Sequence, residues 1–260
     1  MSDTREYDIT SLRSGQHATR VHRDYLAHVF RWGWAARLIN TGKGAHRVLE
    51  AGCGADAPLY LALRGSRGIG HKPELYVGVD LGKIPLIAKR KKDTESSKYL
   101  VLKDEFNFVD RWKELRDEYG STFDLAVSFE VIEHMSERNG DKYLQGIHGL
   151  LKDKGELLIS TPVFNGHAAA NHIKEYTVEE LQKKLKRNGF TVKARYGTFA
   201  SFPTIKRGLK EEHTPEIAKA IQLIYDNVRE FYSDEVLACF LAPMFPDHSR
   251  NNAWIVTKTK

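Results

Sequence analysis

Residues 47–58, with the sequence RVLEAGCGADAP, bring an apolar stretch directly into a glycine-rich turn. The apolar residues predict a short buried β-strand, and Gly52 and Gly54 let the backbone turn sharply and approach a ligand closely. A helix is predicted to begin near Ala57, where free N–H groups and the positive end of the helix dipole face the turn. A strand, a glycine turn and a helix in this order predict an α/β fold with a ligand at the turn.

Glu50 narrows the kind of ligand that this turn can hold. The spacing Gly52-x-Gly54-x-x-Ala57 fits the dinucleotide-binding fingerprint, but it is a weak pattern when taken alone. A carboxylate at the floor of the loop would repel a pyrophosphate, and it would attract an ammonium group such as that of a bound amino acid. This residue therefore argues against an NAD-dependent dehydrogenase.

Further segments with the composition of strands alternate with helical stretches. They lie at 74–81, 97–105, 123–135, where the strand runs on into acidic and histidine residues, and 156–163. This alternation predicts a mostly parallel sheet with ligands at the carboxyl ends of its strands. Asp80 ends the second strand, where a carboxylate can accept both hydroxyls of a ribose. Asp104 ends the third strand, in a position to meet an adenine edge.

With these motifs in this order, the chain resembles the class I S-adenosylmethionine-dependent methyltransferases over roughly residues 46–200. The segments 123–135 and 161–190 are similar to the ubiquinone-biosynthesis-type O-methyltransferase branch. The resemblance implies a Rossmann-like seven-stranded, mostly parallel sheet with helices on both faces, and S-adenosylmethionine as the cofactor. The cofactor contacts that we expect are Glu50, Gly52, Cys53, Gly54, Asp80, Leu81, Asp104, Glu105, Phe129, Glu130 and Arg31.

The end of the fourth strand carries the constellation Glu130, Glu133 and His134, and His172 follows the fifth strand. Two carboxylates and two imidazoles can bind one divalent ion. The same residue types in the same order resemble the metal site of the small-RNA 3′-terminal 2′-O-methyltransferases. In many metal-free relatives, however, Glu133 organises hydrogen bonds and His134 packs or acts as a base. We favour the metal-free interpretation, in which His134, Glu133 and His172 form the catalytic group.

The sequence before and after the core predicts a helical cap, an insertion and a last strand. Residues 1–45 form an expected helical cap, in which Arg31 or Arg23 could hold the carboxylate of the cofactor, although both could equally lie in solvent. The core is expected over 46–198. An insertion over 199–252, with a helix at 214–232 and an irregular piece at 238–252, precedes a last strand at 253–260. The insertion is expected to be either a substrate lid or a dimer interface.

Composition limits the partners only loosely. The net charge of +6 permits nucleic-acid binding without requiring it. No apolar run approaches a membrane span, and the two cysteines fit a cytoplasmic protein without disulfides. Residues 160–163 (STPV) differ from the Asn/Asp-Pro-Pro-Tyr/Phe signature of nucleobase amine methyltransferases. The sequence therefore favours methyl transfer to an oxygen of a small hydroxylated molecule, and a nucleic-acid ribose or a partner subunit without catalysis remain the alternatives.

Overall fold

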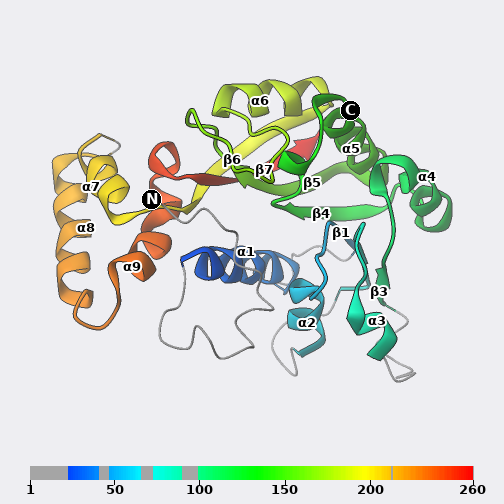
Figure 1. Cartoon of the computed structure of the whole chain (residues 1–260), viewed down its shortest axis with the longest axis horizontal. Coiled ribbons are helices and arrows are strands. Elements are labelled where there is room, and N and C mark those ends of the chain that lie inside the picture. Colours follow the sequence, from blue (N-terminus) through cyan, green and yellow to red (C-terminus); the bar gives the residue numbers. More distant parts are fainter. Residues whose placement is uncertain (1–22, 41–46, 66–72, 90–98, 212, 260) are drawn as a thin grey trace.

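The computed structural model describes residues 23–40, 47–65, 73–89, 99–211 and 213–259. A seven-stranded sheet with the order β3-β2-β1-β4-β5-β7-β6 forms its centre (Figure 1). The strands are β1 (Arg47–Ala51), β2 (Leu75–Val79), β3 (Leu100–Lys103), β4 (Phe123–Phe129), β5 (Leu151–Pro162), β6 (Phe190–Phe199) and β7 (Asn251–Lys258). Strands β1 to β5 pair in parallel, and β7 pairs antiparallel with both β5 and β6. The predicted fold class and the antiparallel last strand are confirmed.

Helices cover both faces of this sheet because its strands are apolar on both sides. One face packs against α1 (Arg23–Asn40), α2 (Pro58–Gly65) and α3 (Pro85–Lys89). The other face packs against α4 (Phe108–Tyr119), α5 (Glu137–Leu150) and α6 (Val178–Arg187). The alternation along β1 and β2 places Glu50 and Tyr76 on the face of α1 and α2. Thr177 is the N-cap of helix α6, and it forms a capping box with Glu180.

Three helices fill the segment between β6 and β7. They are α7 (Phe202–Glu211), α8 (Pro215–Val228) and α9 (Asp234–Leu241), followed by the short 3₁₀ turns η4 (Ala242–Met244) and η5 (Pro246–His248). They enclose an apolar cluster of their own beyond the ends of β6 and β7 (Figure 1). Helix α9 reaches the main body through Cys239, which packs with Ala27 of α1 and Phe199 of β6.

Several predicted boundaries need correction. A helix is present where one was expected at 214–232, but α8 ends at Val228. The piece at 238–252 is not irregular throughout, because it begins inside α9 and ends inside β7. Strand β5 begins at Leu151 rather than at 156, since Leu151 already pairs with Phe123 of β4. Of the expected cap over 1–45, only α1 belongs to the described residues. None of the described helices combines the length and apolar character that a membrane crossing requires.

Candidate active site

A cavity of about 800 Å³ opens at the carboxyl edge of the parallel strands. It is lined by the loop after β1, the end of β2, residues 106–110, the end of β4, the start of α5 and part of α1. The expected residues that line it are Glu50, Gly52, Cys53, Gly54, Asp80, Leu81, Phe129, Glu130 and His134. This volume lies in the range that holds a small molecule or cofactor.

The glycine loop has the geometry that its sequence predicts. Gly52 and Gly54 both have positive φ angles, of 81° and 73°, and a Cβ atom at Gly52 would come within 2.4 Å of the Val131 side chain. The N–H groups of Gly52 and Cys53 donate to the Val79 carbonyl at 2.9 and 3.1 Å. The loop is therefore held against the end of β2, and no larger side chain fits at position 52.

The Asp80 carboxylate lies at the mouth of this loop. One of its oxygens accepts a hydrogen bond from the Gly54 N–H at 2.8 Å, and the other accepts one from the Gly82 N–H at 2.8 Å. These two backbone donors fix the direction of the carboxylate before any ligand arrives. Its position at the end of β2, lining the cavity, is the one expected of a ribose ligand.

Glu50 forms part of the cavity floor and is only 2% exposed. Its carboxyl group accepts a hydrogen bond from the Tyr76 hydroxyl. Burial raises the pKa of Glu50 to about 8, although the hydrogen bond from Tyr76 acts in the opposite direction. Among the described residues no cation forms an ion pair with it, so a cationic ligand would meet a carboxyl group without a competing partner.

The two acidic residues after β3 do not line the cavity. The Asp104 carboxylate accepts a hydrogen bond from the Ile84 N–H at 3.3 Å. The Glu105 side chain is 67% exposed and lies 4.0 Å from the Lys83 ammonium group. The cavity wall is formed instead by residues 106–110, which the sequence interpretation missed. Asn107 is the N-cap of α4 and Asp110 lies in its first turn, so a search for the start of that helix could have found this wall.

Arg31 of α1 is also absent from the cavity lining, because its side chain is buried between α1 and the sheet, against Glu130 and Thr198. Its guanidinium lies 3.5 Å from the Glu130 carboxylate, donates to the Thr198 hydroxyl at 3.3 Å and lies 2.8 Å from His28 Nδ1. His28 and Trp32, on the same helix, do line the cavity. Their rings are stacked, with the ring centroids 5.3 Å apart. The side chain of Arg23 lies outside the described part of the chain.

Glu130 is the first residue after β4, and its backbone has a left-handed conformation with a φ angle of 55°. Its carboxylate accepts hydrogen bonds from Ser160 Oγ at 2.7 Å and from the Asn251 side-chain amide, in addition to the ion pair with Arg31. Strands β5 and β7 and helix α1 therefore all hold this one side chain. The turn that it makes leads the chain into the short 3₁₀ helix η3 (Ile132–His134).

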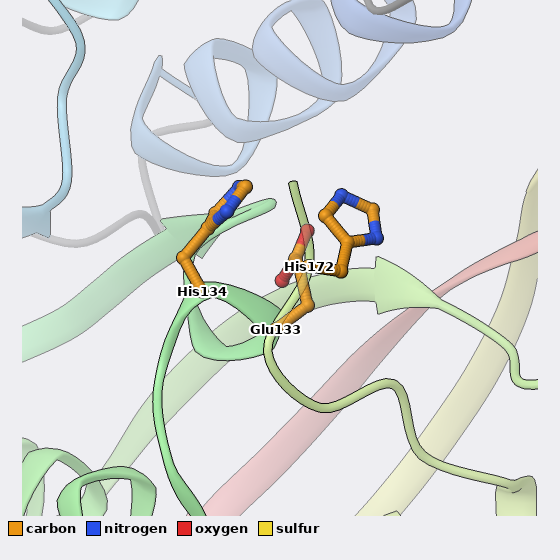
Figure 2. Close-up of side chains that lie close together, drawn as sticks. All are labelled: Glu133, His134 and His172. Atoms are coloured by element: carbon orange, nitrogen blue, oxygen red, sulfur yellow. The ribbon is translucent and has the colours of Figure 1, made fainter. Parts of the chain in front are cut away.

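Glu133, His134 and His172 converge at this point (Figure 2). One potential ligand atom from each lies within 4.8 Å of the others. The two imidazole rings meet edge to face with their centroids 5.0 Å apart. The N–H groups of Ile173 and Lys174 donate to the Glu133 carbonyl at 2.8 and 3.0 Å, and this anchors the loop that carries His172.

The three residues differ in their surroundings. Glu133 is fully buried, and one carboxylate oxygen accepts a hydrogen bond from Thr161 Oγ1 at 3.0 Å, while the other has no hydrogen-bond partner among the described residues. Burial, and then the nearby negative charge of Glu130, raise the pKa of Glu133 well above its usual range. His172 Nδ1 lies 2.6 Å from the Glu175 carboxylate, and His134 is exposed and lines the cavity.

This set of donors fits a divalent ion. A carboxylate oxygen and two imidazole nitrogens are ligands that such ions accept, and the Glu175 carboxylate supports His172 as outer carboxylates support ligating histidines. The structure brings together three of the four residues that the sequence suggested for a metal. Glu130 is not one of them, because its oxygens are engaged by Ser160, Asn251 and Arg31.

Comparisons with known proteins identify the family of the chain and show which solved structures share its fold. A sequence model of the methyltransferase domain matches residues 20–194, whereas no curated protein matches the chain. The fold is similar to that of a 1,6-didemethyltoxoflavin-N1-methyltransferase from Burkholderia thailandensis, solved with 1,6-didemethyltoxoflavin and S-adenosylhomocysteine bound (TM-score 0.55, 17% identity, covering 96% of this chain and 87% of that one).

Two further solved structures share the fold. The StiE O-methyltransferase domain has a TM-score of 0.57 and 14% identity, covering 96% of this chain and 81% of that one. The methyltransferase domain of bacterial CtHen1 has a TM-score of 0.53 and 18% identity, covering 89% of this chain and 99% of that one. Because the family model covers more than half of the chain, the chain belongs to the methyltransferase domain family.

Proposed function

We propose that this enzyme transfers the methyl group to a hydroxyl oxygen of a small molecule, with His134 as the general base. The observation that carries the proposal is the position of His134, which lines the cavity beside the buried Glu133 and His172. An imidazole can remove the proton of an acceptor hydroxyl near neutral pH. The similarity of residues 123–135 and 161–190 to the ubiquinone-biosynthesis-type branch also supports an oxygen acceptor.

In this proposal one end of the cavity binds the cofactor and the other end binds the methyl acceptor. S-adenosylmethionine supplies the activated methyl group when it is bound. Asp80 holds the ribose hydroxyls, Glu50 lies beneath the amino-acid end, and Leu81 and Phe106 flank the adenine. His28, Trp32 and His134 then surround the acceptor on the opposite side, and α1 keeps water away from the reacting atoms.

A second candidate is a metal-assisted enzyme that methylates a ribose 2′-hydroxyl of a nucleic acid. The convergence of Glu133, His134 and His172, with Glu175 behind His172, favours it. A divalent ion, when held by these three residues, supplies positive charge that stabilises a deprotonated hydroxyl. Glu133 would bind such an ion as a carboxylate, and Glu175 would keep the His172 ring in the ligating orientation.

Transfer of a radiolabelled methyl group to a panel of acceptors tests both candidates. The panel contains a catechol, a simple sugar, a ribonucleoside and a short RNA with a free 3′ end. We expect a small hydroxylated acceptor to be labelled, and His134→Ala to slow its labelling by roughly 10²–10⁴-fold as a lost general base. His167→Ala is the matched control, because His167 is an exposed imidazole on the same loop as His172.

A chelator separates the two mechanisms. Unchanged labelling of the small acceptor after chelation supports the metal-free base. Labelling of RNA that is lost on chelation and restored by Mg²⁺ or Mn²⁺ supports the second candidate. Full activity in both His134→Ala and His172→Ala would remove the cluster from the mechanism.

A further inference from the structure

Tyr76 and Glu50 form a buried pair that depends on the register of β1 and β2. Glu50 lies opposite Gly78, and Tyr76 precedes Gly78 by two residues on the same face of β2. A Cβ atom at Gly78 would lie 2.7 Å from the Tyr76 hydroxyl oxygen. The ring of Tyr76 therefore runs along the strand over the space that glycine leaves open, and its hydroxyl reaches the Glu50 carboxyl group.

The surroundings of this pair contain several acidic groups but no cation that pairs with Glu50 among the described residues. Glu50 and Tyr76 are 2% and 0% exposed. The ionisable groups that interact electrostatically with the pair are Asp80 after β2, Cys53 of the loop, Tyr60 of α2 and Tyr143 of α5. Burial raises the pKa of Tyr76 well above its usual range, so its hydroxyl keeps its proton and donates it to Glu50.

We propose that Tyr76 is a positioning residue of the cofactor site, and that Glu50 releases a proton to solvent when the cationic amino group of the cofactor binds. The proposal rests on the placement of the amino-acid end of the cofactor above Glu50. In the free protein no positive charge from the described residues pairs with Glu50, so burial keeps its carboxyl group protonated. A bound ammonium group supplies that charge, and the Tyr76 hydroxyl stabilises the carboxylate that results.

This coupling predicts how cofactor affinity depends on pH. Burial holds the pKa of Glu50 near 8 in the free protein, and a bound ammonium group lowers it. Between these two values the affinity must rise with pH, by up to about tenfold per pH unit. Above the free-protein value Glu50 is already ionised before binding, so the part of the affinity that depends on Glu50 reaches a plateau there.

Isothermal titration calorimetry of S-adenosylhomocysteine with the full chain tests the proposal. Titrations at pH 7 in phosphate and in Tris buffer, which differ in ionisation enthalpy, count the protons released. We expect the wild type to release nearly a full proton and Glu50→Gln to release none. The ligand and the buffers are the same in both titrations, so the difference between these two proteins reports the contribution of Glu50.

The variant Tyr76→Phe tests the positioning role separately. Loss of the hydroxyl removes the hydrogen bond that lowers the pKa of Glu50, so the affinity plateau should move to higher pH while proton release at pH 7 persists. Tyr119→Phe, on α4, is the matched control and should leave the plateau unmoved. Thermal unfolding of each variant reports whether it is folded.

The outcomes are distinguishable. Equal binding enthalpies in the two buffers, after correction for dilution, would overturn the proton coupling while leaving the cofactor site intact. A Tyr76→Phe profile identical to that of the wild type would overturn the role of Tyr76. A wild-type chain that binds no S-adenosylhomocysteine would overturn the cofactor site itself, and this proposal with it.

Discussion

Glu50 illustrates how a single residue can serve ligand binding at the expense of stability. Its side chain is buried near Asp80, and the neutral Tyr76 is its hydrogen-bond donor among the residues that the structure describes. Burial raises its pKa from an ordinary value of 4.5 to about 8. Folding therefore favours the protonated form, and the folded chain becomes less stable as pH rises through the interval between these values.

The substitution Glu50→Gln should consequently stabilise the empty protein at neutral pH. The stability that protonated Glu50 contributes is fully present below pH 4.5 and is lost as pH rises towards 8. The variant should gain on the order of 3 kcal/mol in free energy of unfolding at pH 7, and this gain should vanish near pH 4.5. Urea unfolding across this range measures it, with the exposed Glu179→Gln as the control. A gain that does not change with pH would contradict the assignment.

At the scale of residues, sequence alone identified those side chains whose position follows from a strand end. Glu50 and Asp80 were predicted in this way, and both line the cavity. Asp104 also ends a strand, but it lies beside the Ile84 N–H at the start of α3, and the sequence does not reveal this competing donor. Tyr76 was missed because its contact depends on the register between β1 and β2, which no local pattern encodes.

At the scale of elements, helices α5 and α6 are joined by a buried lysine. Lys184 of α6 is 1% exposed and donates to Glu137 and Asp141 of α5, at 3.1 and 3.0 Å. Its ammonium group also lies 5.4 Å from the centre of the Tyr176 ring. The start of α5, at Ser136 and Asn139, lines the cavity, so this contact supports one wall of the site.

The substitution Lys184→Met should destabilise the protein by about 1–3 kcal/mol, because hydrogen bonds to charged groups contribute about this much. The loss should stay moderate, since Arg187 still pairs with both carboxylates after the change. Lys183→Met on the exposed face of the same helix is the control and should be nearly neutral. Chemical unfolding compares the two variants, and equal stabilities would show that the buried lysine contributes nothing.

Sequence patterns predicted elements best where periodicity and caps agree. The Thr177-x-x-Glu180 pattern before α6 and the apolar spacing of α8 can both be read directly in the sequence. The start of β5 was missed because residues 152–155 are charged or glycine and resemble a turn. Helix α9 was missed because its aromatic and proline-bearing continuation obscured its eight residues, and its helical state depends on packing within the insertion.

At the scale of the whole molecule, the insertion is joined to the sheet at one place. Phe199, the last residue of β6, pairs with Asn251, the first residue of β7. The helices between them have their own apolar cluster and touch the main body mainly through α9, η4 and η5. We expect this insertion to contribute to the acceptor side, although none of its residues lines the cavity among the described residues.

Replacement of residues 202–248 by a short glycine-serine turn tests whether the insertion contributes to the acceptor side and not to the cofactor site. The paired ends of β6 and β7 need only a tight connection, so the shortened chain should fold and bind S-adenosylhomocysteine within a few-fold of the wild type. Methylation of the acceptor should be lost. Calorimetry and the methyl-transfer assay measure the two effects, and loss of cofactor binding would show that the insertion supports the cofactor site instead.

The pairing of Phe199 with Asn251 also has a consequence for how such enzymes diversify. The chain leaves the sheet at Phe199 and returns to it at Asn251, and these two residues pair with each other on adjacent strands. The segment between them can therefore lengthen, shorten or be exchanged without changing the strand order. Asn251 keeps its contact with Glu130 as long as this register is preserved. Natural selection can therefore alter the insertion and the cofactor-binding half at independent rates, and homologues should differ most in length at this position.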